Sequence, residues 1–186
     1  MKQHSRNITI KRGKPMHLQI IGATGTISDK EAFIKKAMNY AEKNHIALQV
    51  FNAELIYGKT HLESAVAHAK RAFQQKTNTT HTLAMEILLY ASGERQLQIA
   101  LPKMGIHKGV CPVALVLFSE ETCGIKVSVI QELLTLLQLK RDDTVLKGDE
   151  TTLQLFGISE KEKQTVTQHK YQNLILEKVA LVDIIK

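Results

Sequence analysis

The sequence predicts a single α+β domain in which a small mixed or antiparallel sheet is covered by several helices. Three observations favour this fold class. The chain has 186 residues, of which 44% are hydrophobic, so one domain with a sizeable core is expected. Segments with helical spacing outnumber strand-like segments, which leaves too few strands for a doubly wound sheet. No internal repeat, low-complexity tract or linker divides the chain.

The domain is expected to span residues 16–186 and to follow a basic arm at residues 1–15. The arm has no acidic residue, and its cations are Lys2, Arg6, Lys11, Arg12 and Lys14. A segment of this composition is either a solvated extension or an electrostatic arm for phosphates.

A strand and a glycine turn are predicted to open the domain. Apolar residues alternate from Met16 to Ile21, and Gly22 and Gly25 then break the pattern. A strand that runs into glycines also resembles the phosphate-binding turn of dinucleotide folds, so an NAD(P)-binding enzyme is one alternative. The third glycine of that motif and a Tyr-x-x-x-Lys pair are absent, which favours a simple tight turn.

Residues 30–51 are predicted to form a helix and then a second strand. Apolar residues recur at helical spacing over residues 30–44, and Ser28 or Asp29 can cap this helix. Over residues 46–51 the apolar residues occupy every second position, which indicates a strand.

Three helices are expected in the middle of the chain. The first covers about residues 60–75 and has one apolar face, with Lys70 and Arg71 on the opposite side. A short apolar helix follows over residues 83–91. Ser92 can cap the third helix, whose apolar stripe approaches a stop near residue 105.

The last third of the chain is predicted to contribute a central strand and two helices. The continuous apolar run from Val113 to Phe118 is typical of a strand that is buried on both faces. Helices are expected at residues 127–139 and 174–185, because their apolar residues follow helical spacing. Val145 and Leu146 form a candidate short strand between them.

Charge and cysteine content narrow the class of protein. The chain carries 25 Lys and Arg against 18 Asp and Glu, a net charge of +7, which favours polyanionic partners. Cys111 and Cys123 do not form a CxxC pair, so we expect two reduced thiols and no metal site. No apolar run is long enough to span a membrane and no signal peptide is present, which predicts a cytoplasmic protein.

Motifs for catalysis are missing from the sequence. His61, His68 and His81 lie near one another in the chain, but no carboxylate or cysteine stands beside them at metal-ligand spacing. HExxH, GxSxG, Walker A and protein-kinase motifs are absent as well. The protein is therefore not expected to be an enzyme and needs no cofactor.

Cationic residues gather instead on the helices in the middle of the chain. If these helices pack side by side, their polar ends form one basic surface that can bind phosphates. Arg95 or His61 could stack against an unpaired base. The residues concerned are Lys59, His61, His68, Lys70, Arg71, Lys76, Arg95 and Lys103.

Two segments between residues 52 and 118 carry a resemblance to a known family. They read HLESAVAHAKRAF and EILLYASGERQLQIALPKMGI, and the second leads to the apolar strand. They resemble the tRNA-binding regulatory subunit of the KEOPS complex, the family of the kinase-binding protein of the p53-related kinase. The match is looser from residue 120 onward, and residues 1–15 have no counterpart.

The resemblance implies a non-catalytic subunit in the synthesis of threonylcarbamoyladenosine in tRNA. Members of that family dock on the small atypical kinase (ATPase) subunit of KEOPS, stimulate the complex and capture the single-stranded CCA end of tRNA. By position, the resemblance implies RNA contacts for Lys59, His61, Lys70, Arg71, Ser92, Gly93, Arg95 and Gln96. A protein-interaction subunit without RNA affinity is a further alternative, in which the charge is incidental.

Overall fold

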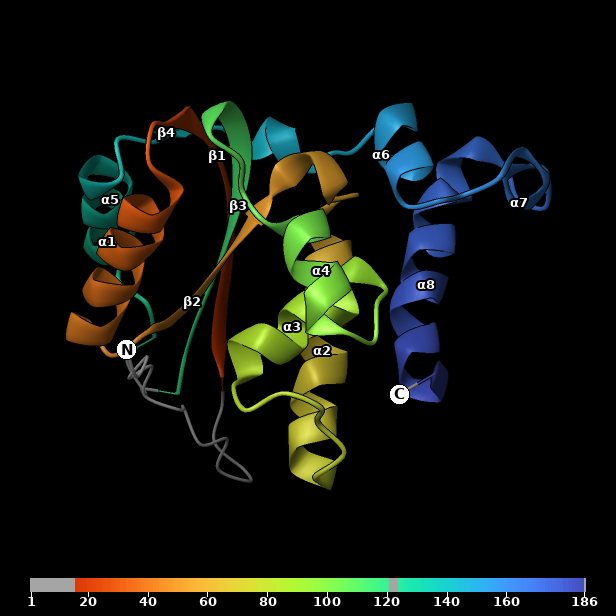
Figure 1. The fold of residues 1–186 in the computed structure, drawn as a ribbon, viewed down its shortest axis with the longest axis horizontal. Helices are drawn as coiled ribbons and strands as arrows, with labels where there is room; N and C mark the ends of the chain where they lie inside the picture. The colour runs from red at the N-terminus through yellow and green to blue at the C-terminus, as the bar shows by residue number, and fades with distance from the viewer. Residues whose placement is uncertain (1–15, 121–123, 186) are drawn as a thin grey trace.

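A four-stranded antiparallel sheet with helices on both faces forms the molecule (Figure 1). The computed structural model describes residues 16–120 and 124–185. The strands lie in the order β2-β3-β1-β4. They are β1 (His17–Ile27), β2 (Ala47–Asn52), β3 (Gly109–Ser119) and β4 (Lys140–Arg141). The predicted α+β class is confirmed, and the sheet is antiparallel rather than mixed.

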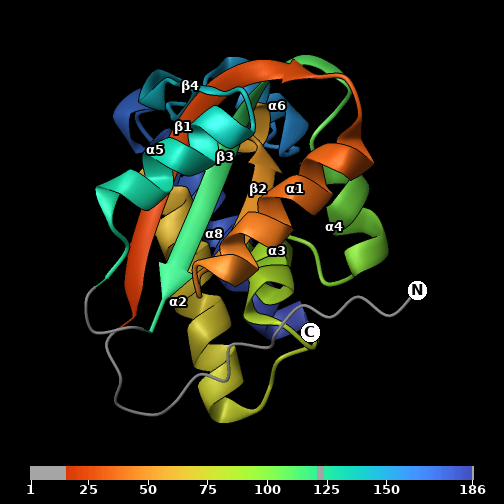
Figure 2. The same cartoon turned by 90° about the vertical axis from the view of Figure 1, so that its left-hand side faces the viewer.

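The helices divide between the two faces of the sheet (Figures 1 and 2). One face is covered by α1 (Lys30–Lys43) and α5 (Val127–Leu136). The other is covered by α2 (Lys59–Gln75), α3 (Leu83–Ser92), α4 (Leu97–Met104) and α8 (Tyr171–Ile185). Shorter elements connect these layers: the 3-10 helices η1 (Ala53–Leu55), η2 (Asp143–Leu146) and η3 (Gln168–Lys170), and the helices α6 (Glu150–Leu155) and α7 (Glu160–Gln164).

Strand β3 contributes to a hydrophobic core on each side of the sheet. Successive side chains of a strand point to opposite faces. Val113, Leu115 and Leu117 therefore pack with α1 and α5, whereas Val116 and Phe118 pack with the helices of the other face. The prediction of a central strand buried on both faces is confirmed, because β3 lies between β1 and β2.

The glycine turn predicted after the first strand is wrong. Strand β1 continues through both glycines to Ile27, and Gly22 and Gly25 pair with residues of β3. A Cβ atom at Gly22 would lie 2.5 Å from the carbonyl oxygen of Asp142, and one at Gly25 would lie 2.5 Å from Cδ2 of Leu139. The glycines thus let the β4–η2 segment cross close to β1. No strand–turn–helix phosphate site exists here, so this basis for an NAD(P)-binding enzyme is removed.

Helices α1, α2 and α3 and strand β2 agree with the prediction to within about one residue, whereas α8 begins at Tyr171, three residues earlier than predicted. Helix α1 begins after Asp29, whose carboxylate accepts a hydrogen bond of 3.0 Å from the N–H of Ala32. Strand β2 and helices α2 and α3 also occupy the expected segments. Helix α5 ends at Leu136, three residues earlier than predicted, and Gln138 then adopts a positive φ of 55°.

The shorter elements between α5 and α8 differ from the prediction. Val145 and Leu146 lie in the 3-10 helix η2 and not in a strand. The short strand in this region is β4, which pairs with β1. Helices α6 and α7 each begin with a capping box, formed by Asp149 in α6 and Ser159 in α7, and the capping boxes stabilise these short helices.

Two predictions fall outside the part of the chain that is described, namely the basic arm at residues 1–15 and the state of Cys123. Cys111 is buried in the core between the sheet and helices α1 and α5. Among the described residues, no helix combines the length and hydrophobicity needed to cross a membrane.

Candidate functional site

Helices α3 and α4 meet in a tight turn at residues 92–96, which we call the corner. Helix α3 ends at Ser92, and Gly93 follows with a φ of 68°, in the left-handed region that favours glycine. Helix α4 begins at Leu97, and the side chain of its N-cap residue, Gln96, makes no capping hydrogen bond. The two successive helices predicted for this stretch are therefore present, with the turn between them.

Ser92 was predicted to cap α4, but it is the last residue of α3, and the N-cap residue of α4 is Gln96. Its side chain is completely buried, and Oγ donates a hydrogen bond of 2.8 Å to the carbonyl oxygen of Leu89. The same Oγ accepts a hydrogen bond of 3.2 Å from the N–H of Glu94. The hydroxyl thus closes the C-terminal end of α3, and the buried side chain is not available to RNA.

Arg95 and Gln96 are the residues that the corner presents to solvent. Both side chains are exposed, and Arg95 forms no ion pair with any described residue. The neighbouring carboxylate of Glu94 is bound by Nζ of Lys103 at 2.9 Å. Arg95 therefore offers an uncompensated guanidinium, which can pair with a phosphate or stack on a base.

His61 is completely buried, which contradicts its predicted role at a basic surface. Nδ1 accepts a hydrogen bond of 3.2 Å from the N–H of Tyr57, so Nε2 carries the proton and donates to the carbonyl oxygen of Ala91 at 2.9 Å. Burial lowers the pKa of His61 to about 4; the bond to Ala91 opposes this shift, and the charge of Lys103 adds to it. The ring is therefore neutral near pH 7 and cannot stack on an RNA base.

Lys59 lies at the start of α2, two residues before His61. Its Nζ pairs with Oδ2 of Asp143 at 3.1 Å, and Arg141 pairs with the same oxygen at 3.1 Å. The sequence did not reveal Arg141, because nothing in it predicts that Arg141 and Lys59 share the carboxylate of Asp143. Arg71 is twelve residues further along α2, which corresponds to about 18 Å of helix.

Arg71 takes part in a network that joins α2 and α3 to the end of α8. Its guanidinium donates to Oδ2 of Asp183 at 3.2 Å, and Nδ1 of His68 lies 2.7 Å from the same oxygen. The hydroxyl of Tyr90 donates to the other oxygen of Asp183. The neighbouring Lys70 is partly exposed. Arg71 is thus half exposed but already paired with a carboxylate.

Helix α8 contacts both the corner and the Arg71 network. Cβ of Lys178 lies 3.4 Å from the position that a Cβ atom would take at Gly93, so this part of α8 borders the corner. Asp183, the partner of Arg71, is five residues further along, or about 7.5 Å of helix. The corner and Arg71 thus both border α8, but the corner lies at the His61 end of α2, because His61 bonds to Ala91, and Arg71 lies near the other end of that helix.

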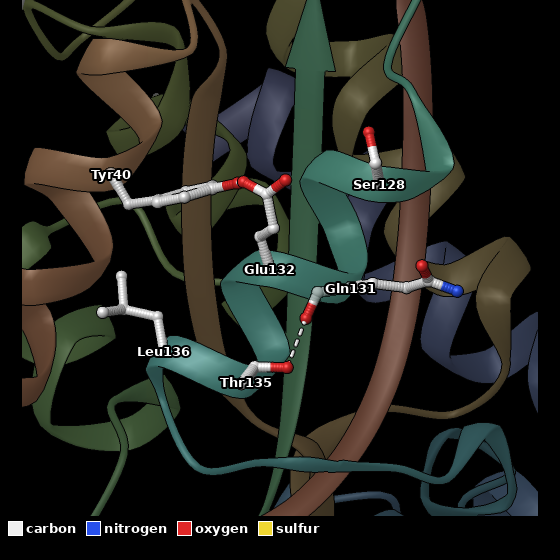
Figure 3. Close-up of a pocket in the computed structure, with 6 residues that line it drawn as sticks. All are labelled: Tyr40, Ser128, Gln131, Glu132, Thr135 and Leu136. Carbon is white, nitrogen blue, oxygen red and sulfur yellow. Dashed lines mark hydrogen bonds between the residues drawn. The ribbon is translucent and has the colours of Figure 1, made fainter.

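A surface depression lies on the opposite face of the sheet, between α1 and α5 (Figure 3). It has a volume of about 490 Å³ and is lined by Tyr40, Ser128, Gln131, Glu132, Thr135 and Leu136. The hydroxyl of Tyr40 donates to Glu132 at 2.8 Å. Burial, followed by this bond and the charge of Glu132, raises the pKa of Tyr40 to about 12. These groups join the two helices, and no predicted site residue lies among them.

Within residues 16–120 and 124–185, no group of three or more His, Cys, Asp or Glu side chains is placed to hold a metal ion. His61 and His68, which lie close in the sequence, have different surroundings: the first is buried against Phe156, and the second lies against Tyr90. The proximity of the histidines in the sequence therefore reflects two separate packing roles.

Comparison with known protein families identifies the family of the chain. The family model described as kinase binding protein CGI-121 matches residues 26–183. This range includes the corner, all of α2 and nearly all of α8. No curated protein matches the chain.

Proposed function

The chain belongs to the CGI-121 family of kinase-binding proteins, and from this premise we propose that it is a non-catalytic subunit of a cytoplasmic KEOPS complex. In this proposal it docks on the small atypical kinase of the complex and stimulates it. It also captures the single-stranded CCA end of the tRNA that is to receive threonylcarbamoyladenosine.

The exposed corner next to α8 carries the RNA part of the proposal. Arg95 and Gln96 are exposed on a turn that hydrogen bonds of Ser92 fix, and Arg71 is bound to the end of α8, the helix that also borders the corner. A single-stranded end has unpaired bases, which bind planar groups, and phosphates, which bind cations. Arg95 can supply both contacts, and Lys70 and Arg71, near the C-terminal end of α2, can add positive charge.

Charge reversal tests the proposed RNA surface. The double variant Arg71→Glu/Arg95→Glu, and Arg95→Glu alone, should weaken tRNA binding by about tenfold or more while the fold is retained. Lys35→Glu/Lys36→Glu is the matched control, because it changes the same charge on exposed residues of α1 across the sheet. Fluorescence anisotropy with tRNA gives the affinity, and circular dichroism checks the fold. Equal affinities for the Arg95 variant and the control would reject this surface.

A change in the tRNA provides the second comparison of this experiment. A tRNA that lacks its CCA end should bind markedly more weakly to the wild-type protein, because the proposed contacts are to that end. Equal binding of the two tRNAs would reject capture of the CCA end, even if the charge reversals weaken binding.

A protein-interaction subunit without RNA affinity is the second candidate. It is favoured by the ion pairs that already occupy two of the proposed cations, Lys59 with Asp143 and Arg71 with Asp183. This candidate predicts binding to the kinase and no shift of tRNA in a gel without the kinase. A shift by the purified protein alone would exclude it.

A further inference from the structure

We propose that Lys103 and His61 are positioning residues that fix the backbone of the corner for RNA and do not themselves touch it. The inference rests on the proposed capture of RNA at the corner and names residues that act from beneath it. Sequence reasoning had counted both side chains among the cations of the binding surface. Their contacts in the structure point inward.

Lys103 uses its ammonium group within the protein. Nζ donates to the carbonyl oxygen of Ser92 at 2.9 Å and to Oε1 of Glu94 at 2.9 Å. It also lies 4.8 Å from the centre of the Phe156 ring, which allows a cation–π contact. An ammonium group has three N–H donors, so two hydrogen bonds and one ring face account for its binding capacity.

His61 holds the preceding peptide of the chain. Its Nε2–H donates to the carbonyl oxygen of Ala91, and its ring meets Phe156 edge-on with the centroids 5.2 Å apart. Phe156 thus packs against both His61 from α2 and Lys103 from α4. The two side chains and this ring form one support beneath the end of α3.

The support completes the hydrogen bonding of the last turn of α3. The last four carbonyl groups of a helix lack partners within the helix. In α3 the carbonyl groups of Leu89 and Tyr90 accept from the backbone N–H of Gly93. The carbonyl group of Ala91 accepts from His61, and that of Ser92 accepts from Lys103. The path of the chain into Arg95 is therefore set by side chains from α2 and α4.

A rigid corner favours binding of a flexible partner. A single-stranded RNA end loses conformational freedom when it binds, and a protein surface that is already ordered adds no further entropic cost. Loss of the Lys103 hydrogen bonds should therefore lower RNA affinity through the mobility of Arg95 and Gln96. It should not remove a phosphate contact.

The salt dependence of binding distinguishes positioning from contact. Lys103→Met keeps an unbranched stem over Phe156 and removes the N–H donors, and tRNA affinity should fall by about tenfold. The slope of log affinity against log salt should stay as in the wild type, whereas loss of a phosphate contact reduces it by about 0.7. Lys103→Arg, which keeps donors, should restore part of the affinity. Lys108→Met, a change at an exposed lysine, controls for the lost charge.

Hydrogen exchange of the free protein adds a readout that does not need RNA. In Lys103→Met the N–H of Glu94 should exchange faster, while the amides of β3 keep their protection. Unchanged exchange at Glu94, unchanged tRNA affinity, or a reduced salt slope would each overturn the positioning role. Failure of the wild-type protein to bind tRNA would instead overturn the proposed function, together with the premise of this inference.

Discussion

His61 shows how a single residue can be assigned to the wrong face of a helix. It stands four residues before Ala65 and eight before Ala69, and both alanines are completely buried in the core that faces α2. The spacing of the sequence therefore places the imidazole on the apolar stripe. Its type, rather than its position, suggested a surface role. A fully buried neutral imidazole with both nitrogens bonded is a structural group.

The buried state of His61 predicts a loss of stability in acid. The pKa is about 4 in the folded protein and 6.5 as its ordinary value, so the unfolded chain binds the proton more readily. The stability that depends on the neutral ring is present above about pH 6.5. It is lost as the pH falls towards 4, by about 3 kcal/mol in total.

Urea denaturation at about pH 7 and about pH 4.5 measures this loss. His61→Gln is the comparison, since an amide can replace a hydrogen bond but does not titrate in this range. Carboxyl groups titrate in both proteins, so the difference between them isolates His61. The free energy of unfolding should fall more steeply in the wild type; parallel losses would show that His61 is not the titrating group.

At the scale of elements, long helices and strands are predictable from periodicity, whereas short ones depend on tertiary contacts. The stripes of α1, α2 and α8 each bury a face, and the apolar run of β3 is buried on both sides. Strand β4 has two residues, both exposed, and owes its existence to pairing with β1. No pattern in a single sequence encodes such a pairing. For the same reason the first strand was predicted to end at Ile21, whereas β1 continues to Ile27.

The corner was predictable in part. Glycine at position 93 indicates a turn between two apolar segments, and the exposed Arg95 follows from the polar sequence around it. The sequence does not show that Lys103 turns inward or that Arg71 pairs with a residue of α8. Both contacts join segments that only the folded chain brings together, eleven and 112 residues apart.

The Asp183 network predicts that the end of α8 is held by a contact that competes with RNA. Asp183→Ala removes the common acceptor of Tyr90, His68 and Arg71. Stability should fall by about 1–3 kcal/mol, because charge-assisted hydrogen bonds are lost. Affinity for tRNA should rise, since the guanidinium of Arg71 is no longer neutralised. Urea denaturation and anisotropy measure the two effects.

Glu177→Ala is the matched control for this change. It removes one negative charge from an exposed residue of the same helix. If both variants raise the affinity equally, the effect comes from net charge and not from the release of Arg71. If Asp183→Ala lowers the affinity, an ordered α8 is required for binding.

At the scale of the whole molecule, the fold separates the cations that a linear sequence seemed to gather. The corner and Arg71 lie on the α8 side, Lys59 pairs with Asp143 beside Arg141, and Lys103 is bound beneath the corner. The net charge of +7 is also unevenly placed, because five positive charges and no negative ones lie in residues 1–15. Overall charge is therefore a poor measure of the proposed RNA surface.

This uneven distribution predicts two separable components of RNA binding. In the full-length protein, changing the five cations of the arm to Gln should weaken binding to every tRNA and reduce the salt slope. The cations are Lys2, Arg6, Lys11, Arg12 and Lys14. For the arm variant, the slope of log affinity against log salt concentration should be about −1 to −2, as expected for two or three phosphate contacts to a single strand. Preference for tRNA with a CCA end should be unchanged, because the proposed recognition lies at Arg95 and Gln96.

Anisotropy titrations with intact and CCA-lacking tRNA over a range of salt concentrations measure both components. Arg95→Glu is the reciprocal variant: it should abolish the preference for the CCA end and leave most of the salt-dependent binding by the arm. Loss of the preference in the arm variant, with its retention in Arg95→Glu, would transfer recognition from the corner to residues 1–15. The expected result is that the arm variant keeps the preference for the CCA end and Arg95→Glu loses it. This result would show that the arm supplies general affinity for polyanions and the folded domain supplies selectivity.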